Sequence, residues 1–234
     1  MKFLTATALT LSLTCLLSSL APLRDGPSAE EKATIAAELP SYPFKTCVVS
    51  KRPLDSGAGP FDLVIDGHLV RVCCPGCEGG ARGKAGEIRR SIERAVIARD
   101  RAHWPMKECP VSGKVYDKAG SKSVELVHGT RYVKLCCQGC VKAFEDDPSA
   151  FMEEIDAAYI KSQLDGYPLK SCPVSKRPLG DAPVDLLYGT TLVRLCCKGC
   201  ERGFKKDPEA IVREINKAWA KAHAEKAERE AEKK

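Results

Sequence analysis

One cysteine motif occurs three times in this chain and constrains its fold more than any other feature. Each copy has the pattern aromatic-Pro-x-Lys-x-Cys, then a gap of 25, 26 or 23 residues, then Cys-Cys-x-Gly-Cys. The lone cysteines are Cys47, Cys109 and Cys172, and the clusters begin at Cys73, Cys136 and Cys196. Tandem copies of roughly 60 residues predict three small modules of one fold rather than one or two ordinary domains.

Within the gap, each copy has two short apolar segments that we interpret as a β-hairpin. In the first copy, residues 61–65 and 69–72 are joined by Asp66-Gly67, a dipeptide that favours a tight hairpin turn. The corresponding segments of the other copies flank turns that contain Gly129 and Gly189. Those segments are residues 124–127 with 132–135, and 184–187 with 192–195.

After each cluster the sequence becomes helical, which makes the predicted fold class α+β. Asp147-Pro148 and Asp207-Pro208 predict an N-cap followed by proline at the first helical position. Apolar residues then recur at helical spacing, for example Ile211, Ile215 and Trp219. The first copy lacks the Asp-Pro pair and has several glycines in this region, so we expect it to be the loosest module and the metal site that is most often empty.

These patterns divide the chain into six segments. We expect a signal peptide at 1–21, a linker with a short helix at 22–40, modules at 41–100, 101–163 and 164–221, and a charged helical tail at 222–234. The leader interpretation depends on Lys2, the apolar stretch after it and small residues up to Ala21. It predicts export to the periplasm or the extracellular space. A lipid anchor at Cys15 is the competing interpretation, but the residues before this cysteine fit lipid attachment poorly.

The cysteines are candidates for metal ligands because modules of this size have little hydrophobic core of their own. Disulfides are the alternative in an exported protein. However, only one cysteine precedes the gap, so each module can form at most one long-range bridge. A basic residue also stands two positions before each cluster (Arg71, Lys134 and Arg194), where it could favour thiolates, although these positions equally suit the exposed face of a strand.

All twelve motif cysteines are therefore candidate ligands for zinc or another soft cation such as copper(I), up to three ions per chain. Four thiolates would complete a tetrahedral zinc site, whereas three or fewer would suit copper(I) or leave a position open. The candidates are Cys47, Cys73, Cys74 and Cys77; Cys109, Cys136, Cys137 and Cys140; and Cys172, Cys196, Cys197 and Cys200.

Taken together, these motifs resemble the TRASH and YHS heavy-metal-binding domains over about residues 42–221, most closely in the second and third copies. The resemblance implies small treble-clef-like modules, each a knuckle, a β-hairpin and a helix, that bind zinc, copper or related ions in metal sensing, trafficking or resistance. It also implies one three-cysteine set per module, with the second cysteine of each pair as an additional candidate. The three sets are Cys47, Cys73 and Cys77; Cys109, Cys136 and Cys140; and Cys172, Cys196 and Cys200. Zinc-ribbon geometry would instead favour the Cys74 and Cys77 type of pair, so both choices stay open.

The function that we expect is metal buffering, trafficking or resistance by a non-enzymatic exported protein. Its partners would be metal ions and a metal transporter or other exported protein, with no nucleic acid and no transmembrane segment after leader cleavage. A thiol-disulfide oxidoreductase and a disulfide-stapled scaffold or interaction protein are the alternatives. The chain lacks the βαβ pattern of a thioredoxin-like redox protein. Ser50, Ser112 and Ser175, which follow the lone cysteines, are expected to support the knuckle turn.

Overall fold

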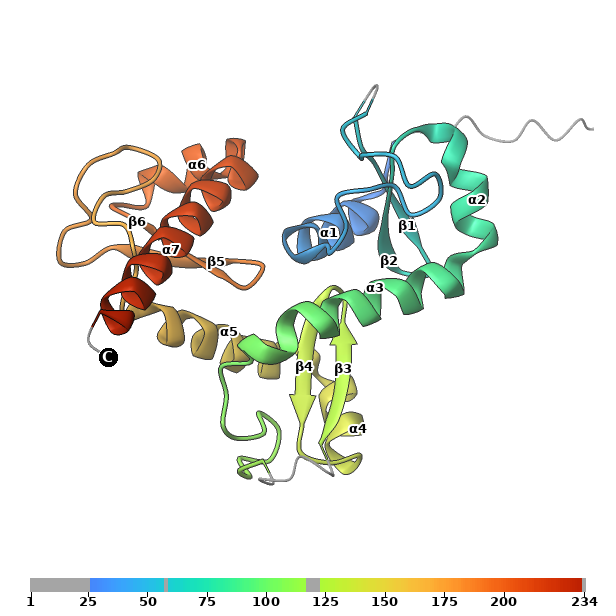
Figure 1. The fold of residues 1–234 in the computed structure, drawn as a ribbon. Coiled ribbons are helices and arrows are strands. Elements are labelled where there is room, and N and C mark those ends of the chain that lie inside the picture. Colours follow the sequence, from blue (N-terminus) through green and yellow to red (C-terminus); the bar gives the residue numbers. More distant parts are fainter. Residues whose placement is uncertain (1–25, 57–58, 117–122, 233–234) are drawn as a thin grey trace, which may run out of the picture.

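The fold was determined from a computed structural model that describes residues 26–56, 59–116 and 123–232. The expected leader, including Cys15, lies outside these ranges. The described chain combines helices with three two-stranded antiparallel sheets, which confirms the α+β class (Figure 1). Each sheet is a hairpin of consecutive strands, so no pairing crosses from one module to another.

The described part of the chain from residue 26 onwards contains a helix and a short 3-10 turn, and the first module follows. These elements are α1 (Ala29–Glu38), η1 (Leu39–Ser41), β1 (Phe61–Ile65), β2 (His68–Val72), η2 (Pro75–Cys77), α2 (Glu78–Gly83), α3 (Ala85–Asp100) and η3 (Arg101–His103). The second module contains β3 (Val124–His128), β4 (Arg131–Leu135), α4 (Gly139–Asp146) and α5 (Pro148–Leu164). The third contains β5 (Val184–Tyr188), β6 (Thr191–Leu195), α6 (Gly199–Lys206) and α7 (Pro208–Ala231).

The three hairpins form where the sequence predicts them, and the pairing extends up to the turns. Phe61 pairs with Val72, and the equivalent pairs in the other modules match the same register positions. The first turn has Asp66 and Gly67 at φ values of 51° and 77°, the left-handed backbone that a two-residue hairpin loop requires. Each hairpin therefore presents its cluster of cysteines directly after its second strand.

The helix starts also agree with the predicted caps. The Asp147 carboxylate accepts a hydrogen bond from the backbone N–H of Ala150 at 3.4 Å, and Asp207 does the same for Ala210 at 3.0 Å. In the first module α3 begins after Lys84, which makes no side-chain cap. This module nevertheless buries Ile88, Ile92 and Val96 along α3, as the helical spacing predicts.

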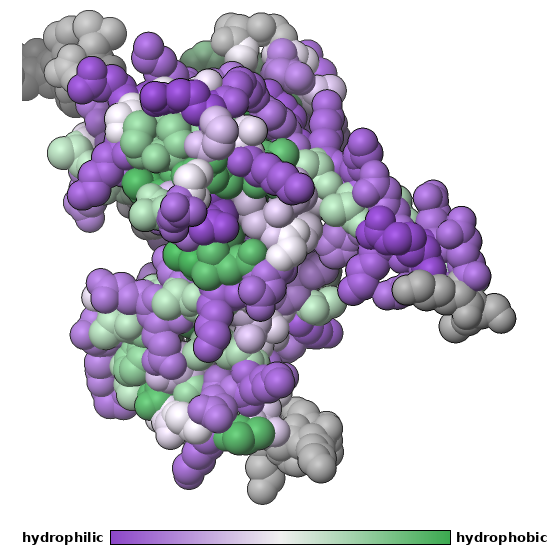
Figure 2. Space-filling view, turned by 90° about the vertical axis from the view of Figure 1, so that its left-hand side faces the viewer, coloured by the Kyte–Doolittle hydropathy of each residue, from purple (hydrophilic) through white to green (hydrophobic). Residues whose placement is uncertain are grey.

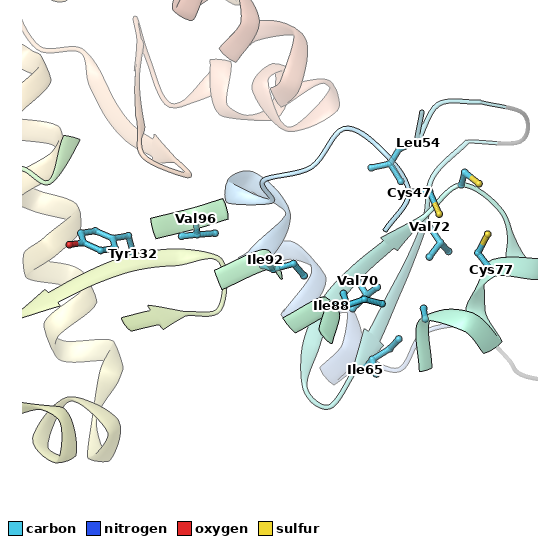
Figure 3. Close-up of a cluster of buried hydrophobic side chains, with 12 residues drawn as sticks. Cys47, Leu54, Ile65, Val70, Val72, Cys77, Ile88, Ile92, Val96 and Tyr132 are labelled. Atoms are coloured by element: carbon cyan, nitrogen blue, oxygen red, sulfur yellow. The ribbon is translucent and has the colours of Figure 1, made fainter. Parts of the chain in front are cut away.

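Consecutive buried residues in the second strand of each hairpin show that both sheet faces are covered. Neighbouring residues of a strand point to opposite faces, so a half-exposed hairpin would alternate buried and exposed positions. Instead Tyr132 and Val133 are both buried, as are Leu192 and Val193 in the third module. Tyr132 packs into the cluster formed by the first module, while Val133 belongs to the core of the second module (Figure 3).

Each hairpin is thus held between the helix that precedes its module and the helices of its own module. Helix α3 contacts β3 and β4, and α5 contacts β5 and β6. Arg89 of α3 donates hydrogen bonds to the backbone carbonyls of Gly129 and Val127, at 2.9 and 3.2 Å. Gln163 of α5 holds the third hairpin from the equivalent helix, where its side-chain oxygen accepts a hydrogen bond from the backbone N–H of Leu192 at 3.0 Å.

Helix α1 fills this position for the first hairpin, although it lies in the segment that we interpreted as a linker. The buried Glu38 carboxylate accepts a hydrogen bond from the backbone N–H of Leu69 at 2.8 Å, which matches the bond between Gln163 and Leu192. The segment around 29–41 therefore acts as an N-terminal cap for the array of modules.

The end of this cap also contacts the turns of the other two hairpins. The backbone carbonyl of Glu38 accepts a hydrogen bond from the Thr130 hydroxyl at 2.6 Å. A Cβ atom on Gly189 would lie only 2.6 Å from the carbonyl oxygen of Pro40. The modules are consequently grouped around a shared centre where α1, α3 and the turn between β5 and β6 meet (Figure 1).

The face of the array in Figure 2 is mainly polar. The face in Figure 2 carries hydrophilic residues over most of its area, with hydrophobic residues in separate patches. Within the described ranges, the chain has no helix whose length and apolar character would suit a bilayer crossing.

The close contact at Gly189 leads to a stability prediction. Gly189→Ala places a methyl group against Pro40 and Ser41 at a φ of 63°, so we expect a loss of roughly 2–4 kcal/mol in the free energy of unfolding. The matched control is Gly180→Ala, whose φ is 70° but whose Cβ would meet nothing within 4 Å. It should cost roughly 1–2 kcal/mol from backbone strain alone. Urea unfolding of both variants measures the difference, and equal losses would contradict a close contact at the centre.

Candidate metal centres

The structure brings three cysteine sulfurs together in each module. Within each triad, the Sγ atoms all lie within 4.8 Å of one another. One sulfur comes from the turn before the hairpin, one from the end of the second strand, and one from the start of the following helix. The triads are Cys47, Cys73 and Cys77; Cys109, Cys136 and Cys140; and Cys172, Cys196 and Cys200.

A tight turn positions the lone cysteine. In the first module the backbone N–H of Cys47 bonds to the carbonyl of Arg52 at 2.7 Å, and the N–H of Lys51 bonds back to Cys47 at 3.0 Å. Lys51 has a φ of 63°, and the equivalent Lys176 has 60°. The turn directs the backbone N–H of Ser50 at the Cys47 sulfur, 3.4 Å away, a contact that favours a thiolate there.

The cluster cysteines are positioned by a sharp turn between strand and helix. In the second module the backbone N–H of Cys140 bonds to the carbonyl of Cys137 at 3.1 Å, and the other modules repeat this bond at the same distance. The turn places the first and third cysteines of the cluster on one side, with the Cys136 and Cys140 sulfurs 3.7 Å apart. In the first module, Figure 3 shows the lone cysteine Cys47 and the last cluster cysteine Cys77 together at one end of the hydrophobic cluster.

These separations suit a metal ion bound to sulfur. With Zn–S bonds of about 2.3 Å, neighbouring sulfurs lie about 3.8 Å apart in a tetrahedral site and about 4.0 Å apart in a planar three-coordinate site. The observed 3.7 Å for Cys136 and Cys140, and for Cys196 and Cys200, is close to both. It is also far longer than a disulfide bond of about 2.05 Å. The twelve described cysteines are all free thiols.

The second cysteine of each pair stands beside the triad rather than in it. Cys74 lies 3.7 Å from Cys77, and Cys137 lies 3.8 Å from Cys140, each measured between sulfurs. Cys197 repeats the arrangement at 3.8 Å from Cys200. Of the two ligand choices that the sequence left open, the geometry therefore groups the lone cysteine with the first and third cysteines of the cluster.

A serine hydroxyl completes the surroundings of each triad. The Ser50 Oγ atom lies 3.2 Å from the Cys73 sulfur, Ser112 lies 3.3 Å from Cys136, and Ser175 repeats the contact. The same hydroxyls also accept the backbone N–H two residues on, so they support the turn as well. Sequence reasoning assigned only this second role. The signal that could have found the first is the recurrence of serine three residues after every lone cysteine.

The cysteines of one triad differ in pKa. Burial alone would raise the pKa of Cys47, but the Ser50 hydroxyl and backbone N–H lower it to about 6, and Cys172 reaches about 6 through Ser175. The backbone N–H of Cys136 and the Ser112 hydroxyl lower the pKa of Cys109 to about 7 against the same effect of burial. These contacts favour the thiolate form of the lone cysteines.

The third cysteine of each triad behaves in the opposite way. Burial and the neighbouring sulfurs raise the pKa of Cys77 and of Cys140 to about 12. Burial raises the pKa of Cys200 to about 11, although the Ser175 hydroxyl acts against it. Without an ion, each triad thus shares one proton or more among its sulfurs, since like charges this close disfavour full ionisation.

The basic residues before the clusters do not act on the thiolates. Arg71 forms an ion pair with Asp62 at 2.7 Å, and Arg194 pairs with Asp185 at 2.8 Å. Lys134 instead lies over the Tyr116 ring, 4.6 Å from its centre. These side chains make cross-strand or ring contacts on the hairpins, and Arg71 and Arg194, with side chains 14% and 23% exposed, are less exposed than the strand interpretation expected. Histidine does not contribute to the triads either: His68 contacts Glu38, and His128 packs on Phe144.

Comparison with known proteins identifies no relative. No family model matches the chain, and neither a curated protein nor a solved structure is significantly similar to it. The geometry of the triads is therefore the basis for any functional conclusion.

The pKa pattern predicts that metal binding releases protons. At pH 7.5 an ion that binds all three sulfurs must displace the proton of Cys77, Cys140 or Cys200, so at least one proton should leave per ion. Affinity should increase with pH, and it should fall more steeply below about pH 6, where Cys47 and Cys172 also become protonated. Calorimetry of zinc binding in buffers with different ionisation enthalpies measures the proton number. No release at pH 7.5 would mean that the third cysteine is not a ligand.

Proposed function

We propose that this protein is an exported, non-enzymatic binder of soft metal ions that holds up to three zinc or copper(I) ions and buffers, carries or presents them. The observation that carries the proposal is the repeated triad: three independent copies of the turn, hairpin and helix bring three sulfurs within 4.8 Å of one another. A disulfide scaffold would not require three sulfurs to lie this close together, because a disulfide joins only two sulfurs.

The donor set favours soft cations. Three thiolates with a serine hydroxyl beside them suit copper(I) in a three-coordinate site, or zinc with a fourth position taken by water, the hydroxyl or another ligand. Hard cations such as Mg²⁺ prefer oxygen ligands. An ion in each triad would also join the knuckle, the hairpin and the helix, since the triad cysteines belong to the three hydrophobic clusters.

The order of elements supports the resemblance to TRASH and YHS domains. In each module the lone cysteine lies in a knuckle turn, a hairpin follows, and the last cysteine begins a helix or the 3-10 turn that leads into it. Treble-clef-like modules of this kind are the basis for assigning metal trafficking or resistance. Export and a metal transporter as partner depend on the leader pattern in the sequence.

Metal content tests the proposal directly. Elemental analysis of protein purified from its native compartment should give about three ions per chain, because each triad is complete. Cys136→Ser should lower the value to about two, and Cys136→Ser combined with Cys196→Ser should lower it to about one. Thiol titration of the freshly denatured protein should find free cysteines. Protein that contains neither metal nor free thiols would instead support the disulfide-stapled scaffold.

The serine contact gives a sharper test of the site geometry. Ser112→Cys adds a sulfur 3 to 4 Å from Cys136 and should convert the three-sulfur site into a four-sulfur tetrahedron. We expect zinc affinity at this site to increase at least tenfold, about 1.4 kcal/mol. The bound cobalt(II) spectrum should show stronger sulfur-to-metal charge-transfer bands. Ser112→Ala is the control and should not increase affinity. Equal affinities for the Cys and Ala variants would place the hydroxyl away from the ion.

A further inference from the structure

In the second and third modules the four cysteines form two triangles of sulfurs that share an edge. In the second module the inner triangle is the triad of Cys109, Cys136 and Cys140. The outer triangle replaces Cys109 by Cys137, whose sulfur lies 3.8 Å from Cys136 and 3.8 Å from Cys140. The shared edge, between Cys136 and Cys140, measures 3.7 Å.

The third module repeats this arrangement closely. Its outer triangle has edges of 3.9 Å between Cys196 and Cys197, 3.8 Å between Cys197 and Cys200, and 3.7 Å between Cys196 and Cys200. Both outer triangles thus have the separations that we found suitable for a sulfur-bound ion. Each of these two modules therefore offers two three-sulfur positions, which share two of their ligands, and in the first module Cys74 lies 3.7 Å from Cys77.

The two positions differ in their access to solvent. The lone cysteines that complete the inner triangles are buried, with Cys109 1% exposed and Cys172 0% exposed. Cys137 is exposed, and Cys197 is partly exposed. An incoming ligand can therefore reach an ion in the outer triangle, whereas the knuckle turn covers the inner one.

We propose that the second cysteine of each pair, Cys74, Cys137 and Cys197, is a transfer ligand that moves the ion from the buried triad to the surface. This inference rests on the proposed metal-binding function. The first and second cysteines of each cluster are adjacent residues at the end of a strand, so their side chains leave the chain on different sides. Both sulfurs nevertheless reach the third cysteine of the cluster.

The transfer is a ligand exchange without a change of oxidation state. The Cys137 sulfur forms a bond to the ion and gives its proton to solvent, and the bond from the ion to Cys109 breaks, which leaves Cys109 as a thiolate. Cys136 and Cys140 remain bound during this exchange, so the ion keeps at least two protein ligands until it reaches the outer position. A thiolate of an acceptor then adds to the exposed ion and displaces the remaining cysteines.

The test compares exchange rate with equilibrium binding. The triple variant Cys74→Ser, Cys137→Ser and Cys197→Ser and the wild-type chain are loaded with copper(I). Each is then mixed in a stopped-flow instrument with a bidentate copper(I) chelator that absorbs visible light once it takes up the ion. The matched control is Pro75→Ser, Gln138→Ser and Lys198→Ser, which changes the next residue in each cluster and leaves every sulfur in place.

We expect the triple cysteine variant to bind three ions with wild-type affinity within about threefold and to lose them at least tenfold more slowly, while the control keeps the wild-type rate. An unchanged rate would overturn the proposal, and so would a loss of affinity of a hundredfold or more, because Cys137 and its equivalents would then be permanent ligands. In both cases the wild-type chain still binds metal and the proposed function stands. Failure of the wild-type chain to bind copper(I) or zinc would reject both proposals.

Discussion

Everything in each module depends on one contact, between the turn that carries the lone cysteine and the junction where the second strand becomes a helix. The two sides are separated by 23 to 26 residues of sequence, yet their sulfurs come within 4.8 Å. This approach is electrostatically costly without an ion, because thiolates repel one another and the third cysteine of each triad keeps its proton. A bound cation would attract all three sulfurs, so bringing them together would become favourable. The same residues that would bind the metal therefore decide how stably the module is folded.

The second constraint is that the second and third hairpins each pack against two modules. A two-stranded hairpin is marginally stable alone, and here each is packed on both faces. Tyr132 fills the cluster of the first module from the second hairpin, and Leu187 packs against the cluster of the second module from the third. The array consequently needs α1 before its first hairpin, and Glu38 makes the same backbone contact there that Gln163 makes later. Beyond Trp219, α7 continues to Ala231 as a largely exposed, charged helix.

Local features of the fold could be predicted from the sequence, whereas contacts between segments could not. The hairpins and capped helices follow from Asp66-Gly67 and from Asp147 and Asp207, which act on residues a few positions away. The repeat predicted three equivalent cysteine sites, and the three-cysteine sets were expected from the resemblance to TRASH and YHS domains. The partner of Arg71 could not, since Asp62 lies opposite it only in the register that the hairpin adopts. The contact between each serine hydroxyl and the first cluster cysteine could not be predicted either, because it depends on how close the turn after the lone cysteine lies to the end of the second strand.

The first module shows which features set the metal geometry. Its helix α3 has no side-chain cap, and Ala81 stands where the other modules have phenylalanine, which led us to expect an empty site. Yet the sulfurs of Cys47, Cys73 and Cys77 also lie within 4.8 Å of one another, and Ser50 lies 3.2 Å from Cys73. The triad is positioned by backbone hydrogen bonds of the turn and of the strand-helix junction, and these are the same in all modules. A weaker helix therefore reduces the stability of the first module without removing its ligands, and a bound ion would contribute most to folding there.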